Sequence, residues 1–140
     1  MDEKLKIAIT KSAKGMLNSL PILVGVVLLI GLASTLIPKS FYNTLFSKNV
    51  VLDSIVGSGL GSILAGNPVT SYVIGGELLK QGISLVAVTS FLVAWVTVGL
   101  VQFPAEALLL GRRFAILRNI LSFVFSIIVA IITVFIVGLV

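Results

Sequence analysis

Long runs without a charged residue dominate the pattern of hydrophobic and polar positions along the chain, and three of them have the pattern of a continuous span. They cover residues 15–38, 81–105 and 119–140. Each run exceeds the roughly 20 apolar residues that a helix needs to cross about 30 Å of hydrocarbon at about 1.5 Å per residue. The pattern therefore predicts transmembrane helices near residues 17–37, 83–103 and 119–140.

The segment before the first run has a helical pattern of its own. Apolar residues recur at helical spacing from Leu5 to Met16, and the lysines lie elsewhere on the helical wheel. This is typical of an amphipathic helix in the headgroup region, over residues 1–16. A solvated extension of the first span fits the same pattern.

Residues 38–50 are expected to connect the first span to the next segment. Phe41, Tyr42 and Phe46 lie there among polar residues, as aromatic side chains do at the membrane–water interface.

Residues 51–82 have the least regular pattern. The stretch from 54 to 76 is uncharged, but it contains six glycines as well as Pro68. Because glycine and proline interrupt helices, we expect a broken helical hairpin here, either re-entrant or made of two short helices. Gly66, Asn67 and Pro68 are expected to form its turn.

Capping signals indicate where the two pieces begin and end. Asp53 is a favourable N-cap for a first helix that stops near Gly66. Asn67 is a favourable N-cap for a second helix that runs to about Gln81, with Pro68 at its first position. The pieces would contain about 12 and 14 residues, or roughly 18 and 21 Å, which is short for a membrane span.

The basic residues predict the orientation. If the broken segment returns the chain to the side it came from, four N-terminal lysines share a side with Arg112, Arg113 and Arg118, and three lysines lie opposite. A continuous span over 54–76 would place the arginines outside, against the positive-inside rule. We expect a multi-pass protein of the cell membrane with a cytoplasmic N-terminus, a cytoplasmic Arg112–Arg118 loop and an external C-terminus.

Composition supports a membrane protein. The 140 residues are 58% hydrophobic and 11% charged, with a mean hydropathy of +1.22, whereas a soluble domain is about 45–50% apolar and about 25% charged. A small soluble domain cannot bury so much apolar surface. The prediction is an all-α polytopic protein whose partner is the lipid bilayer. Its excess of basic residues is then a topology signal, not a sign of nucleic-acid binding.

Neither cysteine nor histidine occurs in the chain. This excludes disulfides and thiolate catalysis, and it removes the usual ligands of zinc and soft metals. No G-x-S-x-G nucleophile motif is present. We expect no enzyme activity, no cofactor and no metal site.

The break in the broken segment is the candidate substrate pathway. Unwound backbone in a bilayer is tolerated where it is buried in protein or lines a wet cavity, and transporters use the free N–H groups of half-helices there. The candidate pathway residues are Gly66, Asn67, Pro68, Thr70 and Ser71. The alternative is that the small residues only allow helices to pack closely.

Two ridges of small residues favour such close packing on the first helix of the broken segment. They consist of Gly57, Gly61 and Ala65, and of Ser58, Ser62 and Gly66.

Two carboxylates near the predicted spans are candidate ion-coupling groups, because acids buried in membranes are usually functional. Glu77 has Lys80 three residues later, which permits a local ion pair instead. Glu106 follows a predicted helix end. The alternative to an ion-coupling role is that it pairs with Arg112 or Arg113 at the membrane interface.

The stretch from Gly66 to Leu92 resembles the predicted permeases of the ArsP-like family, in which a Gly-rich broken segment leads into a Leu-Leu-basic-x-Gly run and an (Ala/Ser)-Phe-Leu helix. The matching positions are Leu78, Leu79, Lys80, Gly82, Ile83, Leu85, Ser90, Phe91 and Leu92. The longer members contain two related halves, so the resemblance implies a half-size permease that needs a second copy or a paralogue. Arsenic-exporting members are thought to use cysteines, which this chain lacks, so thiol-based export of organoarsenicals is not implied.

Together these observations predict a transporter subunit that moves a small solute or ion near residues 66–71, within a homodimer or a larger homo-oligomer. The alternative is a non-transporting scaffold or accessory subunit of the membrane.

Overall fold

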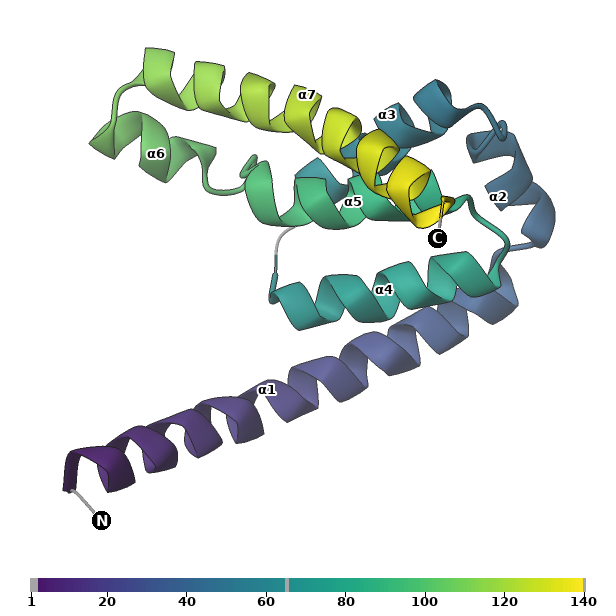
Figure 1. The fold of residues 1–140 in the computed structure, drawn as a ribbon. Helices are drawn as coiled ribbons and strands as arrows, with labels where there is room; N and C mark the ends of the chain where they lie inside the picture. The colour runs from purple at the N-terminus through teal and green to yellow at the C-terminus, as the bar shows by residue number, and fades with distance from the viewer. Residues whose placement is uncertain (1–2, 65, 140) are drawn as a thin grey trace. The chain divides into compact units, whose positions relative to one another are not determined.

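The computed structural model describes residues 3–64 and 66–139, and every regular element within them is an α-helix (Figure 1). The helices are α1 (Glu3–Leu36), α2 (Lys39–Leu45), α3 (Val50–Ile63), α4 (Pro68–Lys80), α5 (Leu85–Thr97), α6 (Phe103–Leu109) and α7 (Arg112–Val137). The predicted all-α class is confirmed for these residues. The helices form two units, α1 by itself and α2–α7 together.

The first unit is one unbroken helix. The sequence suggests a boundary near Met16, between the segments 1–16 and 17–37, but α1 continues through it. A continuous helix agrees with the alternative in which the N-terminal segment extends the first span. Pro21 lies inside α1. Its missing N–H removes one hydrogen bond without ending the helix. The segment Glu3–Ala33 is long and apolar enough to cross a membrane.

Within the described residues, two helices rather than three have the length of a full span. The second is α7, with 26 residues. The helix predicted over 83–103 is instead α5, which has 13 residues and ends at Thr97. At about 1.5 Å per residue it is about 20 Å long, shorter than the hydrocarbon core. Pro104 has no N–H to bond the Leu100 carbonyl oxygen, so a helix cannot continue regularly through this point. It lies in the first turn of α6, where that N–H is not needed.

In the second unit, α5 is the central helix and packs against α3, α4 and α7 (Figure 1). Because these three helices cover α5 on several sides, most residues from Val86 to Trp95 are buried. A Cβ at Gly57 would meet Ala87, and one at Gly61 would meet Phe91, so α3 and α5 run in the same direction. A Cβ at Gly75 would meet Val88 and Leu92.

The glycine ridge predicted on α3 is a packing surface. An added Cβ at Gly57 would collide with the Ala87 carbonyl oxygen, and one at Gly61 would collide with the Phe91 carbonyl oxygen. The third member of the ridge, Ala65, lies outside the described residues. The two helix backbones approach so closely only because these positions carry no side chain.

The serine ridge joins α3 to α7. The hydroxyl groups of Ser58 and Ser126 are 2.8 Å apart in a buried hydrogen bond. Ser62 donates instead to the Ser58 carbonyl oxygen, at 2.6 Å. Buried hydroxyl groups in this unit are thus paired within the protein, as burial requires.

A small apolar cluster closes the end of the unit where α3 and α5 begin. It contains Phe46, Ile83, Ala87 and Val88. Phe46 was expected at the membrane interface, but it is 7% exposed and belongs to this core. Phe41, in contrast, is exposed.

Candidate functional site

The described residues between α3 and α4, which are Leu64, Gly66 and Asn67, are not helical, as the glycine and proline pattern suggests. α3 ends at Ile63 with Leu64 as its C-cap, and α4 begins at Pro68 with Asn67 as its N-cap. The N-cap of α3, however, is Asn49 and not Asp53. Asp53 lies in the first turn of α3 and uses its carboxylate for contacts outside the helix.

The amides at the start of α4 are already hydrogen-bonded. The Asn67 side chain accepts a bond from the Val69 N–H at 2.9 Å. The Thr70 N–H donates to the Asn67 carbonyl oxygen, also at 2.9 Å, and Pro68 has no N–H. The N–H groups of Val69 and Thr70 are therefore bonded within the chain and are not the free donors that the sequence suggests, and the solute pathway at the break stays a prediction.

The two hydroxyl groups of the candidate pathway are buried. Thr70 is 7% and Ser71 1% exposed. The Ser71 hydroxyl donates to the Pro68 carbonyl oxygen at 2.7 Å. Together with the Asn67 cap, this leaves Gly66 and Pro68 as the members of the predicted pathway that line a cavity.

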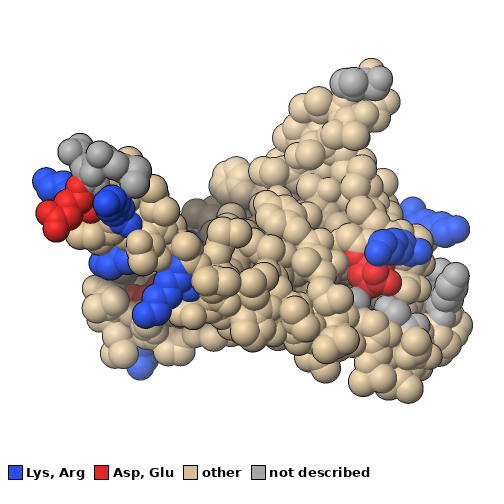
Figure 2. Space-filling model, turned by 90° about the horizontal axis from the view of Figure 1, so that it is seen from below, with Lys and Arg blue, Asp and Glu red and all other residues tan. Residues whose placement is uncertain are grey.

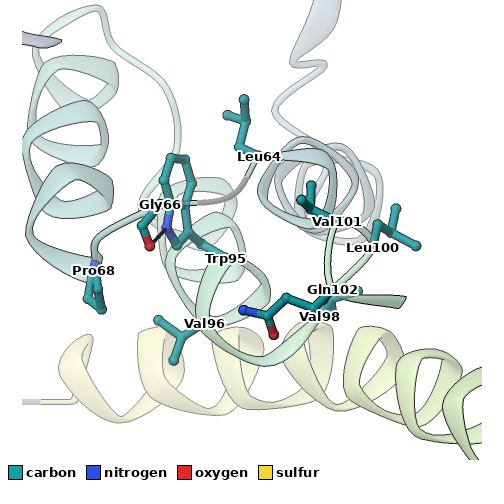
Figure 3. Close-up of a pocket in the computed structure, with 10 residues that line it drawn as sticks. Leu64, Gly66, Pro68, Trp95, Val96, Val98, Leu100, Val101 and Gln102 are labelled. Atoms are coloured by element: carbon teal, nitrogen blue, oxygen red, sulfur yellow. Dashed lines mark hydrogen bonds between the residues drawn. The ribbon is translucent and has the colours of Figure 1, made fainter. Parts of the chain in front are cut away.

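That cavity has a volume of about 250 Å³ and lies where two non-helical segments meet (Figure 3). Leu64, Gly66 and Pro68 line it from the connection between α3 and α4, and residues 98–102 line it from the connection between α5 and α6. The end of α5 contributes Trp95, whose indole N–H donates to the Gly66 carbonyl oxygen at 3.4 Å. Trp95, which the sequence suggests only as a packing residue, thus links the two segments.

Among the residues that line this cavity and that the structure describes, none has a charged side chain. Its polar groups are the Gln102 amide and main-chain groups, and Figure 3 shows the Gln102 side chain extending toward Val96. Residues 98–102 were predicted to be helical and were missed as part of the site. Gly99 and Pro104 were the available signals, because both weaken a helix at this point.

A polar network fixes the second non-helical segment to α7. Glu106 forms an ion pair with Arg118, not with Arg112 or Arg113 as expected. The Asn119 side-chain amide donates to Glu106 at 3.3 Å, and its Oδ1 accepts from the Gly99 N–H at 2.9 Å. Arg118 also donates to the Thr97 carbonyl oxygen at 3.3 Å.

Glu77 lies at the other end of α4 and away from the cavity at the break. It pairs with Lys80 at 3.3 Å, the local pair that the spacing permits, and accepts from the Gln81 amide at 3.4 Å. Arg112 and Arg113 are exposed at the start of α7. The candidate pathway and the two candidate coupling acids therefore do not form one site.

No group of three or more acidic side chains that suits a metal ion occurs in residues 3–64 and 66–139. Comparisons with protein-family models, curated proteins and solved structures give no match. The resemblance to ArsP-like permeases thus rests on the matching residues alone.

Proposed function

We propose that the chain is a subunit of a membrane permease that moves a small solute or ion, with its pathway at the cavity between the two non-helical segments. The observation that carries this proposal is the convergence of Leu64, Gly66 and Pro68 with residues 98–102 on one cavity. Irregular backbone at membrane depth is stable where it is buried in protein or lines a water-filled space. A pair of interrupted helices around one space is the arrangement that transporters use for substrate sites.

The distribution of apolar surface supports insertion into a bilayer. α7 exposes large apolar side chains along its length, including Phe114, Leu121, Phe125, Ile132 and Phe135. In the view of Figure 2, charged side chains gather in a few small groups and leave broad uncharged areas. Exposing so much apolar surface to water is unfavourable, whereas contact with lipid acyl chains is not.

The short helices fit two crossings better than a shallow hairpin. α3 and α5 run in the same direction, and α4 connects the end of one to the start of the other. α3, α4 and α5 are about 20 Å long, which local thinning of the bilayer accommodates at modest cost. If the N-terminus is cytoplasmic and each of these helices crosses the bilayer, the arginines of α7 would be cytoplasmic, in agreement with the positive-inside rule.

The proposal includes a homo-oligomer, most simply a dimer. The resemblance is to one half of a two-part permease, and permeases of that kind place substrate between their related halves. A second copy, or a paralogous half, would supply the other wall of the pathway.

Proteoliposomes containing the full chain test this function. Osmotic swelling is followed by light scattering with urea, glycerol, glycine and ethylammonium chloride as separate solutes. We expect at least one of them to enter faster than in protein-free liposomes. Val101→Trp places a large side chain in the cavity and should slow that entry, whereas Leu109→Trp, at an exposed position outside the cavity, should not.

Two results would contradict the permease. One is entry of every solute at the protein-free rate, and the other is entry that Val101→Trp leaves unchanged. The small-residue contacts of α3 would then favour the alternative, a scaffold or accessory subunit that packs against other membrane proteins.

A further inference from the structure

A second cavity lies at the opposite end of the α3–α5 pair, where both helices begin. Its volume is about 310 Å³, within the range of pockets for small molecules. Six of its lining side chains carry the inference: Tyr42, Phe46, Lys48, Asp53, Gln81 and Ser84. They come from α2, the loop before α3, the first turn of α3 and the connection between α4 and α5.

Asp53 is the central group of this cavity. It is 1% exposed. One carboxylate oxygen accepts from the Ser47 N–H at 2.9 Å, and the other accepts from the Ser84 hydroxyl at 2.7 Å. Among the residues that the structure describes, no cation forms an ion pair with Asp53. A buried carboxylate of this kind is costly without a positive partner, and each of its oxygens can accept a further hydrogen bond.

Two local features around this carboxylate depart from ordinary conformational preferences. Lys48 has a φ of 61°, in the left-handed region that side-chain-bearing residues disfavour. Ser84 is the N-cap of α5, but its side chain makes no capping bond and instead donates to Asp53. Strain of this kind persists where the surroundings impose it, often at binding sites.

The aromatic lining specifies the ligand further. Phe46 is buried and Tyr42 is half-buried, and both face the cavity that Asp53 lines. A carboxylate beside aromatic rings is the combination that recognises an ammonium group, through charge-assisted hydrogen bonds and cation–π attraction. A primary ammonium group carries three donors, which suits the open acceptor positions of Asp53.

We propose that this cavity binds a small organic cation with a primary ammonium group. The ammonium group bonds to Asp53 and the hydrocarbon part contacts Tyr42 and Phe46, with the Gln81 amide nearby. Lys48 lines the same cavity and is exposed. Its like charge opposes the ligand, so it weakens binding and favours release.

This inference names a substrate class for the proposed permease and to that extent rests on the proposed function. The binding site itself is independent of transport. With α3 entering from outside, the Asp53 cavity opens at the external end and the cavity at the break opens at the cytoplasmic end.

Isothermal titration calorimetry of the full chain in detergent tests the site, with n-butylammonium chloride as the probe. Sodium butyrate and n-butanol have the same chain length without the positive charge. We expect saturable binding of the ammonium compound only. Asp53→Asn should weaken it by about tenfold or more, since it removes the charge partner. Glu3→Gln removes a carboxylate from α1 and should leave binding unchanged.

Lys48→Gln gives a prediction of opposite sign, because loss of the opposing charge should tighten binding severalfold. Tyr42→Leu should weaken it. These two variants decide the question if Asp53→Asn does not fold. The proposal is overturned if butanol binds as well as butylammonium, if folded Asp53→Asn keeps the affinity, or if Lys48→Gln weakens binding. Binding without flux in proteoliposomes would leave this site intact and refute the permease.

Discussion

At the scale of single residues, glycines in neighbouring turns of α3 have opposite surroundings. Gly57 and Gly61 face α5, where an added Cβ would collide with main-chain oxygens. Gly59 lies between them in sequence, and a Cβ there would meet nothing within 4 Å. The same residue type therefore has a packing role at two positions and none at the third.

Gly57→Ala should lower the free energy of unfolding by about 1–3 kcal/mol, because main-chain atoms cannot move aside as a flexible side chain can. Gly59→Ala is the matched control and should raise stability by up to about 1 kcal/mol, since alanine favours helix more than glycine does. Unfolding of the detergent-solubilised protein, followed by circular dichroism, measures both. Equal effects of the two substitutions would contradict the close contact between α3 and α5.

Residue partners were the least predictable feature of this chain. The Asn67 cap follows from its position before Pro68 and is confirmed. The partner of Glu106 does not follow from the sequence, because Arg112, Arg113 and Arg118 are all close in sequence and only tertiary packing selects Arg118. The contacts of Asp53 with Ser47 and Ser84 join three segments and have no local signature.

At the scale of helices, the hydropathy pattern predicts the all-α class correctly but makes the helix over residues 83–103 too long. Hydropathy describes α7 well, because a long uncharged run and a long helix coincide there. It fails for residues 83–103, where an apolar run contains the whole of α5, a non-helical segment and the start of α6. Hydropathy reports the polarity of side chains and not the conformation of the backbone, so it does not distinguish an apolar non-helical segment from a helix. The sequence therefore indicates only the wall of this cavity that contains Gly66, and not the wall formed by residues 98–102.

The caps of α3 and α4 give a prediction for the element scale. Asn67→Ala and Asn49→Ala should each lower stability by about 1 kcal/mol, because each removes side-chain bonds to the first amides of a helix. Asn18→Ala, inside α1, should not destabilise, since alanine is the better helix former. The measurement is again unfolding by circular dichroism.

The same variants separate the two roles considered for Asn67. If Asn67 only caps α4, the solute flux of Asn67→Ala, normalised to folded protein, should equal that of the unmodified chain. A fall in flux at unchanged stability would contradict the capping role and return Asn67 to the pathway.

At the scale of the whole molecule, charge and the helix order together predict one orientation for every copy. Seven basic residues lie on the expected cytoplasmic side and three on the other, out of the ten Lys and Arg in the chain. A dimer of oppositely inserted copies would need a near balance, because the positive-inside rule acts on each chain as it inserts. The proposed oligomer is therefore expected to contain copies that share one orientation, so that equivalent cavities face the same side.

Single cysteines test this orientation without background, because the chain contains none of its own. Thr44→Cys and Leu109→Cys are both exposed and lie in α2 and α6. A membrane-impermeant maleimide applied to intact cells should label Thr44→Cys alone, and Leu109→Cys should react only after the membrane is opened. Labelling of Leu109→Cys to similar extents before and after opening would mean that copies insert both ways. The seven-to-three charge difference would then be too small to govern insertion, and the pathway would have to form between inverted subunits.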